Sequence, residues 1–334
     1  MFELTIPKAG FPPGVINILS GAGSVGALLA SHMSIAKIAF TGSEAGGRAV
    51  MGAAAKSNLK IVSLELGGKS PALIFDDADI DNAVTHNSIN FLRNSGQICF
   101  AASRVLVQEG IAQDFIKAVR TAFEDAADKM GDPSVDSTVF GPLADKKQFD
   151  RVMEFLAEGK KQGVEFIAGG ERKGDKGTFV LPTIMLNPDV KSRVYTDEIF
   201  GPVISIRTFK SEDEAIELAN NTSYGLGSTV FTADVARALR VAGKLEAGTV
   251  GINSAFATSQ QTPFGKSFPH SATLLRSSLT LTSCRRRTQA KWHWSGERGR
   301  WPEGLCAAED HSYQYECAST CEEVMLGGQA ANIN

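Results

Sequence analysis

Short apolar segments alternate along this chain with longer segments in which apolar residues recur every three or four positions. That alternation predicts strands separated by amphipathic helices, and therefore parallel sheets in an α/β fold. The predicted strands are 15–20, 35–40, 61–66, 203–207 and 227–231. The predicted helices are 111–130, 145–162 and 212–220. Two shorter helices are also predicted, one that begins near residue 27 and another that ends at Ala55.

The bulk composition is that of an ordinary globular protein. The 334 residues suffice for one large or two ordinary domains, 43% of them are hydrophobic, and the net charge of −3 gives no reason to expect a nucleic-acid partner. No run of eighteen apolar residues predicts a membrane span, and the first ten residues lack a signal-peptide pattern. We therefore expect a cytoplasmic protein without nucleic-acid or membrane partners.

Cysteine is unevenly distributed. Cys99 is the only cysteine before residue 284, and the other four follow in the last fifty-one residues. A long body with one thiol is not held together by disulfides, which fits a reducing compartment. Cys99 follows G-Q-I and precedes an apparent strand. Such a thiol is a nucleophile if its pKa is lowered, and a buried inert side chain otherwise.

Two glycine-containing junctions suggest binding of phosphate groups. G-A-G-S-V-G at 21–26 matches the dinucleotide fingerprint, but no acidic residue ends the next strand, so a simple tight turn is the alternative. At F-T-G-S, 40–43, Ser43 and the free amides of the following helix either hold a phosphate or form an ordinary helix cap.

A carboxylate stands at the end of another predicted strand. Glu65 in E-L-G-G-K-S-P, 65–71, is followed by two glycines that leave the backbone bare beside it. It is either a general base or a solvated loop carboxylate.

These stretches together resemble the aldehyde dehydrogenase superfamily, between about Gly10 and Gly265. The motifs G-F-P-P-G-V-I-N-I-L-S-G, F-T-G-S, L-E-L-G-G-K-S-P, G-Q-I-C, E-I-F-G-P-V and P-F-G occur in family order at fitting distances. The resemblance implies a partial Rossmann-type cofactor domain in residues 1–67 and an α/β catalytic domain in 68–265.

The resemblance also implies a reaction. Cys99 would attack an aldehyde, the thiohemiacetal would pass hydride to NAD and become a thioester, and Glu65 would activate the water that hydrolyses it to a carboxylic acid. NADP remains open as the cofactor. The predicted cofactor contacts are Gly23, Thr41, Gly42, Ser43, Gly47, Leu66, Glu198 and Phe200. The resemblance also implies a structural role for Lys69. No metal is implied, and relatives form homo-oligomers.

The chain departs from the family pattern in two places, and these departures lead to alternative interpretations of its tail and its function. Family members begin upstream of Met1, and beyond Gly265 the chain leaves the family pattern. We expect residues 266–285 to be translated intron, 286–334 to be exon read out of frame, and 266–334 to be irregular. This explanation is favoured over a zinc site at His311, Cys317 and Cys321. The alternative function is an inactive or esterase-only fragment of such an enzyme.

Overall fold

A computed structural model of the chain describes residues 8–255 and residue 265. The predicted irregular tail at 266–334, with its candidate zinc ligands, lies outside the described residues, as do Pro263 and Phe264 of the P-F-G motif. The boundaries proposed at residues 67 and 265 remain predictions.

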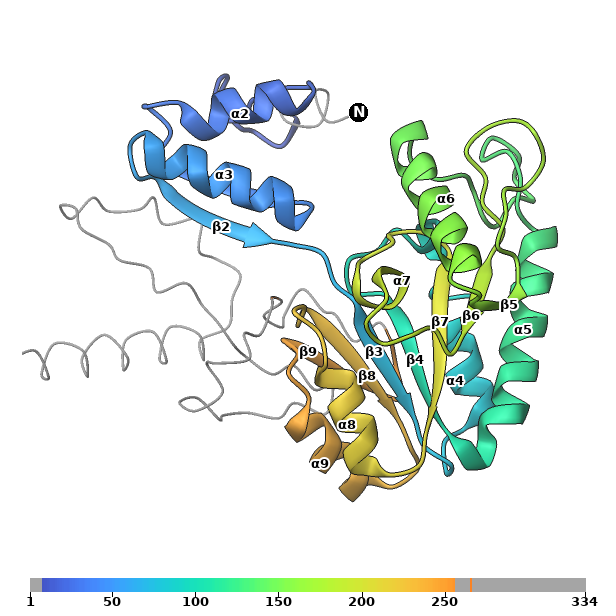
Figure 1. Cartoon of the computed structure of the whole chain (residues 1–334). Coiled ribbons are helices and arrows are strands. Elements are labelled where there is room, and N and C mark those ends of the chain that lie inside the picture. Colours follow the sequence, from blue (N-terminus) through green and yellow to red (C-terminus); the bar gives the residue numbers. More distant parts are fainter. Residues whose placement is uncertain (1–7, 256–264, 266–334) are drawn as a thin grey trace, which may run out of the picture. The chain divides into compact units, whose positions relative to one another are not determined.

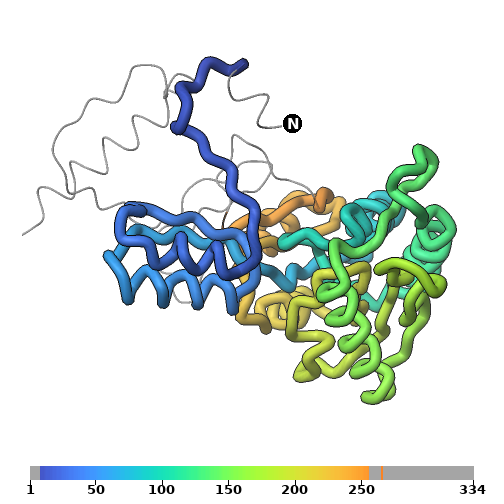
Figure 2. Tube along the Cα trace, turned by 90° about the horizontal axis from the view of Figure 1, so that it is seen from above, coloured from blue at the N-terminus to red at the C-terminus, as the bar shows by residue number. Residues whose placement is uncertain are grey.

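The first part of the described chain forms a small parallel sheet with two helices. Its elements are α2 (Gly23–Ser31), β1 (Lys37–Thr41), α3 (Glu44–Lys56) and β2 (Ile61–Glu65). β1 and β2 pair in parallel, with Thr41 opposite Glu65. α2 and α3 lie side by side (Figures 1 and 2). The strands predicted at 35–40 and 61–66 are confirmed.

The strand predicted at 15–20 is wrong. Gly14 has a φ of +86°, and Asn17 Nδ2 donates to the Gly14 carbonyl at 2.8 Å, which forms a turn in place of an extended run. Val15 and Leu19 are exposed. Apolar β-branched residues do not form a strand without a neighbouring strand to pair with their backbone. The 21–26 glycine motif therefore does not follow a strand.

The larger part of the described chain is built on a seven-stranded sheet (Figure 1). The strand order is β5-β6-β7-β4-β3-β8-β9, and every pair is parallel except β5 with β6. The strands are β3 (Ser70–Ile74), β4 (Ala102–Gln108), β5 (Glu165–Ala168), β6 (Thr183–Leu186), β7 (Val203–Phe209), β8 (Gly227–Phe231) and β9 (Thr249–Ile252).

The helices of this part connect the strands and confirm the predicted segments 111–130, 145–162 and 212–220. They are α4 (Ile80–Asn87), α5 (Ala112–Asp128), α6 (Lys146–Lys161), α7 (Arg193–Thr196), α8 (Glu212–Asn220) and α9 (Val235–Lys244), with 3-10 turns η1 (Arg93–Gly96) and η2 (Glu109–Ile111). The alternation of strand and helix confirms the predicted α/β class.

Helices cover both faces of this sheet because alternate strand residues point to opposite faces. On one face, α4 and α5 bury Phe115, Val119 and Phe123 against Ile74 and other residues of the strands. On the other face, α8 and α9 pack over β3, β4, β8 and β9, while α6 and α7 pack over β6 and β7 (Figure 1). The buried sheet is therefore a rigid base for the loops at the amino ends of β3 and β4.

Candidate active site

The loop that carries Cys99 is held in an unusual backbone conformation. Asn94 and Ser95 have φ angles of 50° and 56°, a left-handed region that residues other than glycine rarely adopt. Ser95 Oγ donates to the Gly141 carbonyl at 2.7 Å, and Gln97 Oε1 accepts from the Ala144 amide at 3.0 Å. These contacts fix the turn that ends at Cys99, immediately before β4.

The Cys99 thiol is half-buried in this turn. Burial raises its pKa, and the charges of Glu198 and then Glu65 add to that effect, while the amides of Cys99 and Phe100 act in the opposite direction by hydrogen bonding. Both carboxylates predicted to take part in the reaction therefore contribute to the raised pKa of the thiol.

Glu65 is the last residue of β2. Its Oε2 is buried and has no hydrogen-bond partner in the described part of the chain. Burial raises the pKa of this carboxyl group. An ideal Cβ built on Gly265 would lie 3.7 Å from Glu65 Oε1, so the carboxylate lies close to the backbone of Gly265. A carboxylate with a free oxygen and a raised pKa has the properties of a general base.

The junction between β1 and α3 lies beside Glu65. Gly42 donates its amide to the Glu65 carbonyl at 3.0 Å. Ser43 caps α3, with Oγ accepting from the Gly46 amide at 3.2 Å. The cap is therefore real, and the amides of Glu44 and Ala45 stay available for an anion because the first amides of a helix have no intrahelical acceptor.

Gly47 of α3 lies against Leu66, which follows the end of β2. A Cβ on Gly47 would approach Leu66 Cδ2 to 2.7 Å, so the glycine lets α3 pack closely over the end of β2. Gly23 is different: it opens α2, and a Cβ added there would meet nothing within 4 Å. The structure thus groups Thr41, Gly42 and Ser43 with Glu65 and gives Gly23 no comparable packing role.

Glu198 and Phe200 lie between α7 and β7, where side chains from other elements bind the backbone carbonyls. Arg151 Nη2 donates to Glu198 O at 2.9 Å, and Gln148 Nε2 donates to Ile199 O and Phe200 O at 2.9 and 2.7 Å. Phe200 has a φ of 57°. The sequence motifs did not indicate Gln148 and Arg151. The two residues are three positions apart on the predicted helix 145–162, so both lie on one face of that helix. This spacing is the feature of the sequence that could have indicated them.

Lys69 supports the same loop from the other side. Its Nζ donates to Asp197 O at 2.6 Å and to Val194 O at 3.2 Å. Burial, followed by the charge of Arg104, lowers the pKa of Lys69 to about 7. These backbone contacts agree with the structural role expected for it.

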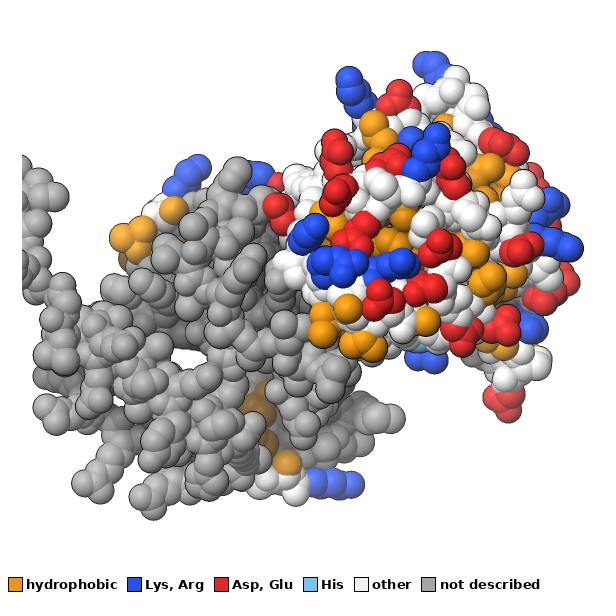
Figure 3. All heavy atoms as spheres, turned by 90° about the horizontal axis from the view of Figure 1, so that it is seen from below, with side chains coloured by type: hydrophobic (Ala, Val, Ile, Leu, Met, Phe, Trp, Pro, Cys, Tyr) orange, Lys and Arg blue, Asp and Glu red, His pale blue; other side chains and the backbone are white. Residues whose placement is uncertain are grey.

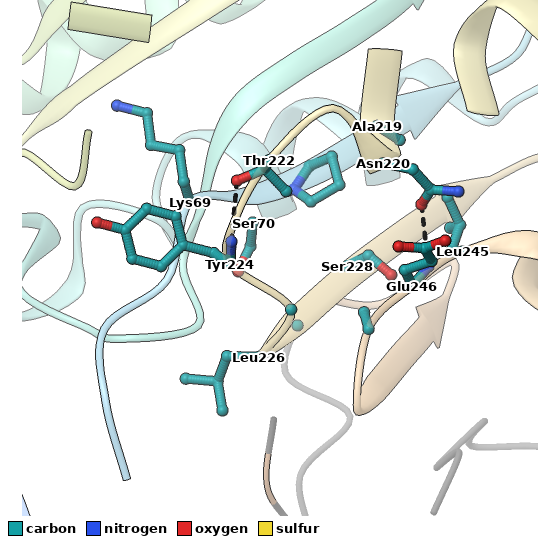
Figure 4. A pocket seen from close by; sticks show the side chains of 14 residues that line it. Lys69, Ser70, Ala219, Asn220, Thr222, Tyr224, Leu226, Ser228, Leu245 and Glu246 are labelled. Carbon is teal, nitrogen blue, oxygen red and sulfur yellow. Dashed lines mark hydrogen bonds between the residues drawn. The ribbon is translucent and has the colours of Figure 1, made fainter. Parts of the chain in front are cut away.

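A small pocket lies between the amino ends of β3 and β8 and the ends of α8 and α9 (Figure 4). The Glu246 amide donates to Asn220 Oδ1 at 2.9 Å, and the Tyr224 amide donates to Thr222 Oγ1 at 3.2 Å. Ser70 Oγ and Ser228 Oγ are buried without hydrogen-bond partners in the described chain. Neither Cys99 nor Glu65 lines this pocket.

Within the part of the chain that the structure describes, no helix has the length and apolarity needed to cross a membrane. In the same residues, no three or more His, Cys, Asp or Glu side chains are grouped so as to hold a metal ion.

The sequence model described as the aldehyde dehydrogenase family matches residues 1–266. The chain belongs to the aldehyde dehydrogenase family. An aldehyde dehydrogenase of Emericella nidulans is 48% identical over 261 residues, which are 78% of this chain and 52% of that protein. Human aldehyde dehydrogenase 1A1 is 46% identical over 262 residues, again 78% of this chain and 52% of the relative.

The fold is also that of solved aldehyde dehydrogenases. A Staphylococcus aureus betaine aldehyde dehydrogenase, solved in complex with NAD+, superposes with a TM-score of 0.76 at 37% identity, covering 80% of this chain and 53% of that one. The chain therefore spans about half the length of the curated relatives it matches.

Proposed function

We propose that this chain carries the nucleophile and the general base for the oxidation of an aldehyde to a carboxylic acid with NAD or NADP. The observation that supports this most directly is the placement of Glu65 and Cys99. Glu65 ends β2 and Cys99 lies in the turn before β4, yet the charge of Glu65 contributes to the raised pKa of the Cys99 thiol. One Glu65 oxygen is buried and has no hydrogen-bond partner among the described residues.

The described residues fit a dinucleotide cofactor. The free amides of the first α3 turn, capped by Ser43, suit a phosphate, and the Glu198 carboxylate is held at the backbone of Gly68, with Oε1 accepting from the Gly68 amide at 3.1 Å. Thr41, Gly42, Ser43, Gly47, Leu66, Glu198 and Phe200 would hold the cofactor, with Gly23 the least supported of the predicted contacts. When bound, NAD would supply a hydride acceptor.

Cys99 and Glu65 would carry out the other steps of the reaction. The Cys99 thiol would lose its proton to solvent, and the resulting thiolate would attack the aldehyde carbon. The Cys99 amide would donate to the resulting oxyanion. After oxidation the acyl group is a thioester on Cys99, and Glu65 would take a proton from the attacking water. The acid leaves and the thiolate is restored, so water supplies the added oxygen.

The test uses the purified 334-residue chain with an aldehyde and NAD, and in parallel with an activated ester alone. We expect formation of reduced cofactor, its loss in Cys99→Ser, and slower turnover by about 10²- to 10⁴-fold in Glu65→Gln. If neither reaction depends on Cys99, the proposal is wrong.

A second candidate is hydrolysis of esters or thioesters without cofactor. The observation that favours it is that a free, half-buried Cys99 and a Glu65 whose buried Oε2 has no hydrogen-bond partner are both among the described residues. Ester hydrolysis that is lost in Cys99→Ser, together with no NAD binding in a titration, would select this candidate over aldehyde oxidation.

A further inference from the structure

Arg104 is a fully buried cation that the reaction steps described above do not use. It lies on β4, shortly after the turn that carries Cys99, and the residue is 1% exposed. Its guanidinium donates to three backbone carbonyls. Nε donates to Lys69 O at 2.8 Å, Nη1 to Leu218 O at 3.0 Å and Nη2 to Ala219 O at 2.8 Å. A buried charge is costly unless partners satisfy it, so these bonds fix the guanidinium in place.

Two of the three carbonyls belong to the last turn of α8. The last carbonyls of a helix have no intrahelical partner and form the negative end of the helix dipole. Arg104 brings both hydrogen-bond donors and a positive charge to this end. The helix therefore anchors the guanidinium, and the guanidinium holds the third carbonyl, that of Lys69, directly before β3.

The pairing of β3 with β4 is irregular at this level. Ser70 lies opposite Ala102, whereas Pro71 lies opposite Arg104. β4 thus has an extra residue between these two pairs, and such a bulge locally disrupts the ladder of backbone hydrogen bonds. Pro71 also has no amide to donate. The bond from Arg104 to the Lys69 carbonyl therefore ties the two strands together where their backbone pairing is interrupted.

The Lys69 carbonyl lies next to a close contact within the candidate site. Gly68 precedes Lys69, and a Cβ on Gly68 would lie 2.4 Å from the Cys99 carbonyl oxygen. Glu65, at the end of β2, is slightly further upstream. The short segment from Glu65 to Lys69 thus runs from the carboxylate, past the Cys99 backbone, to the carbonyl that Arg104 holds.

We infer that Arg104 is a positioning residue of this site. Through the Lys69 carbonyl it holds the segment from Glu65 to Lys69 against the turn that carries Cys99. It thereby keeps the Glu65 carboxylate in place relative to the thioester that forms on Cys99. The inference rests on the proposed function for the roles of Cys99 and Glu65.

Hydrolysis of an activated ester separates two steps that depend differently on this placement. In the first step the Cys99 thiolate attacks the ester carbon and the phenolate leaves, which requires the thiolate alone. In the second step water attacks the thioester, Glu65 takes a proton from that water, and the acid and the thiolate are released. Loss of the Arg104 bonds should therefore slow the second step more than the first.

The experiment follows hydrolysis of p-nitrophenyl acetate by the full chain in a stopped-flow instrument. The burst amplitude counts active sites, the burst rate constant reports acylation, and the steady-state rate per active site reports deacylation. A variant that merely folds to a smaller extent lowers the amplitude and leaves both constants unchanged. Arg104→Lys keeps the charge but replaces the rigid fork of donors with a point charge on a flexible stem.

Arg207→Lys is the matched control. The Arg207 guanidinium lies 5.8 Å from the centre of the Tyr195 ring, and the Arg104 guanidinium lies 5.6 Å from the same ring. Nη1 of Arg207, however, donates to the Pro188 carbonyl and not to the segment from Glu65 to Lys69.

We expect the deacylation constant to fall by about 10- to 10²-fold in Arg104→Lys, with a much smaller change in acylation. Arg207→Lys should leave both constants at their wild-type values. In a Glu65→Gln background, Arg104→Lys should slow deacylation little further, because the base that it positions is already lost. Equal slowing in both backgrounds, or a lower amplitude with an unchanged deacylation constant, would overturn the inference.

Hydrogen exchange tests the same contact without turnover. Arg104→Lys and Arg104→Gln should both speed exchange of the amides in 66–70, whereas Arg207→Lys should not. Unchanged exchange there would contradict the inference, and so would loss of the fold in both Arg104 variants, because the whole sheet would then require Arg104. If the wild-type chain shows no Cys99-dependent reaction, the proposed function fails, and hydrogen exchange alone decides whether Arg104 holds this segment.

Discussion

At the scale of single residues, the candidate site depends on glycines, because their lack of a side chain lets other groups approach the backbone closely. Gly67 and Gly68 separate Glu198 from Cys99, and Gly96 lets the loops that carry these two residues touch. The motif L-G-G-K was recognisable in the sequence, but the reason for its second glycine was not. That reason is a close approach to the carbonyl oxygen of a residue thirty-one positions later, which no local pattern records.

We expect the substitution Gly68→Ala to displace the Cys99 backbone, because the surrounding structure has no room for the added methyl group. The added Cβ would lie 2.4 Å from the Cys99 carbonyl oxygen, a backbone atom that cannot rotate away. We expect a loss of about 1–3 kcal/mol in the free energy of unfolding from overpacking, and a fall of about 10²-fold in ester hydrolysis from misplacement of the thiol.

Gly52→Ala is the matched control for this substitution. Gly52 lies inside α3, and a Cβ there meets nothing within 4 Å. It should raise stability by about 0.5–1 kcal/mol because alanine favours helix. Denaturant unfolding and initial rates on an activated ester check both variants. Equal ester rates in wild type and Gly68→Ala would contradict the argument.

At the scale of elements, the hydrophobic pattern predicted most of the helices and several strands correctly. The segments 145–162 and 212–220 succeeded because one face of each helix is buried on the sheet, as with Val152 and Ala215. The antiparallel strands β5 and β6 were not predicted, since β5 has only four residues and alternation of strand with helix indicates parallel pairing. The strand at 15–20 failed because apolar character cannot show whether a pairing partner exists.

The ends of three elements are joined by Asp77, beyond the carboxyl end of β3. Thr232 Oγ1 donates to Asp77 Oδ1 at 2.7 Å, the Asp234 amide donates to Oδ2 at 3.1 Å, and Arg237 pairs with it at 3.1 Å. Burial acts to raise the Asp77 pKa, but the Thr232 bond, the Arg237 charge and the Asp234 amide together outweigh it and lower the pKa. The carboxylate thus connects β3, β8 and the start of α9.

Asp77→Asn should therefore destabilise the fold in a pH-dependent way. A carboxyl group whose pKa is lower in the folded state stabilises above its unfolded pKa, and that contribution disappears as the pH falls through the folded pKa. We expect the variant to cost about 1 kcal/mol at pH 7 and the cost to shrink progressively below about pH 4.

Urea unfolding at several pH values measures this cost. Asp175→Asn, in an exposed loop, should stay within about 0.5 kcal/mol of wild type throughout. A cost for Asp77→Asn that is the same at pH 7 and pH 3 would show that its hydrogen bonds, and not its charge, are what matter.

At the scale of the whole molecule, two kinds of surface coexist. On the face shown in Figure 3, acidic and basic side chains are intermixed over the described chain. Arg240 and Glu212 form one ion pair of the described chain, at 2.6 Å. The two-stranded part carries a different surface: Leu28, Met33 and Leu59 are 69%, 66% and 78% exposed. Several large apolar side chains this exposed within one small region favour association with other molecules.

Replacing part of that apolar surface should change association without changing folding. We expect the double variant Leu28→Lys, Met33→Lys to bind less of a hydrophobic dye and to aggregate more slowly, because two exposed side chains lose their apolar contacts and gain hydrated charges. Its free energy of unfolding should stay within about 0.5 kcal/mol of wild type per substitution, since neither side chain is buried.

The contrasting variant is Leu73→Lys, whose side chain is fully buried in β3. A buried, unpaired ammonium should unfold the sheet or lower its stability by several kcal/mol, and dye binding should rise. Dye fluorescence, light scattering and denaturant unfolding on the three proteins separate these outcomes. If the double variant aggregates as fast as wild type, the exposed residues of α2 and its following turn are not the cause of association.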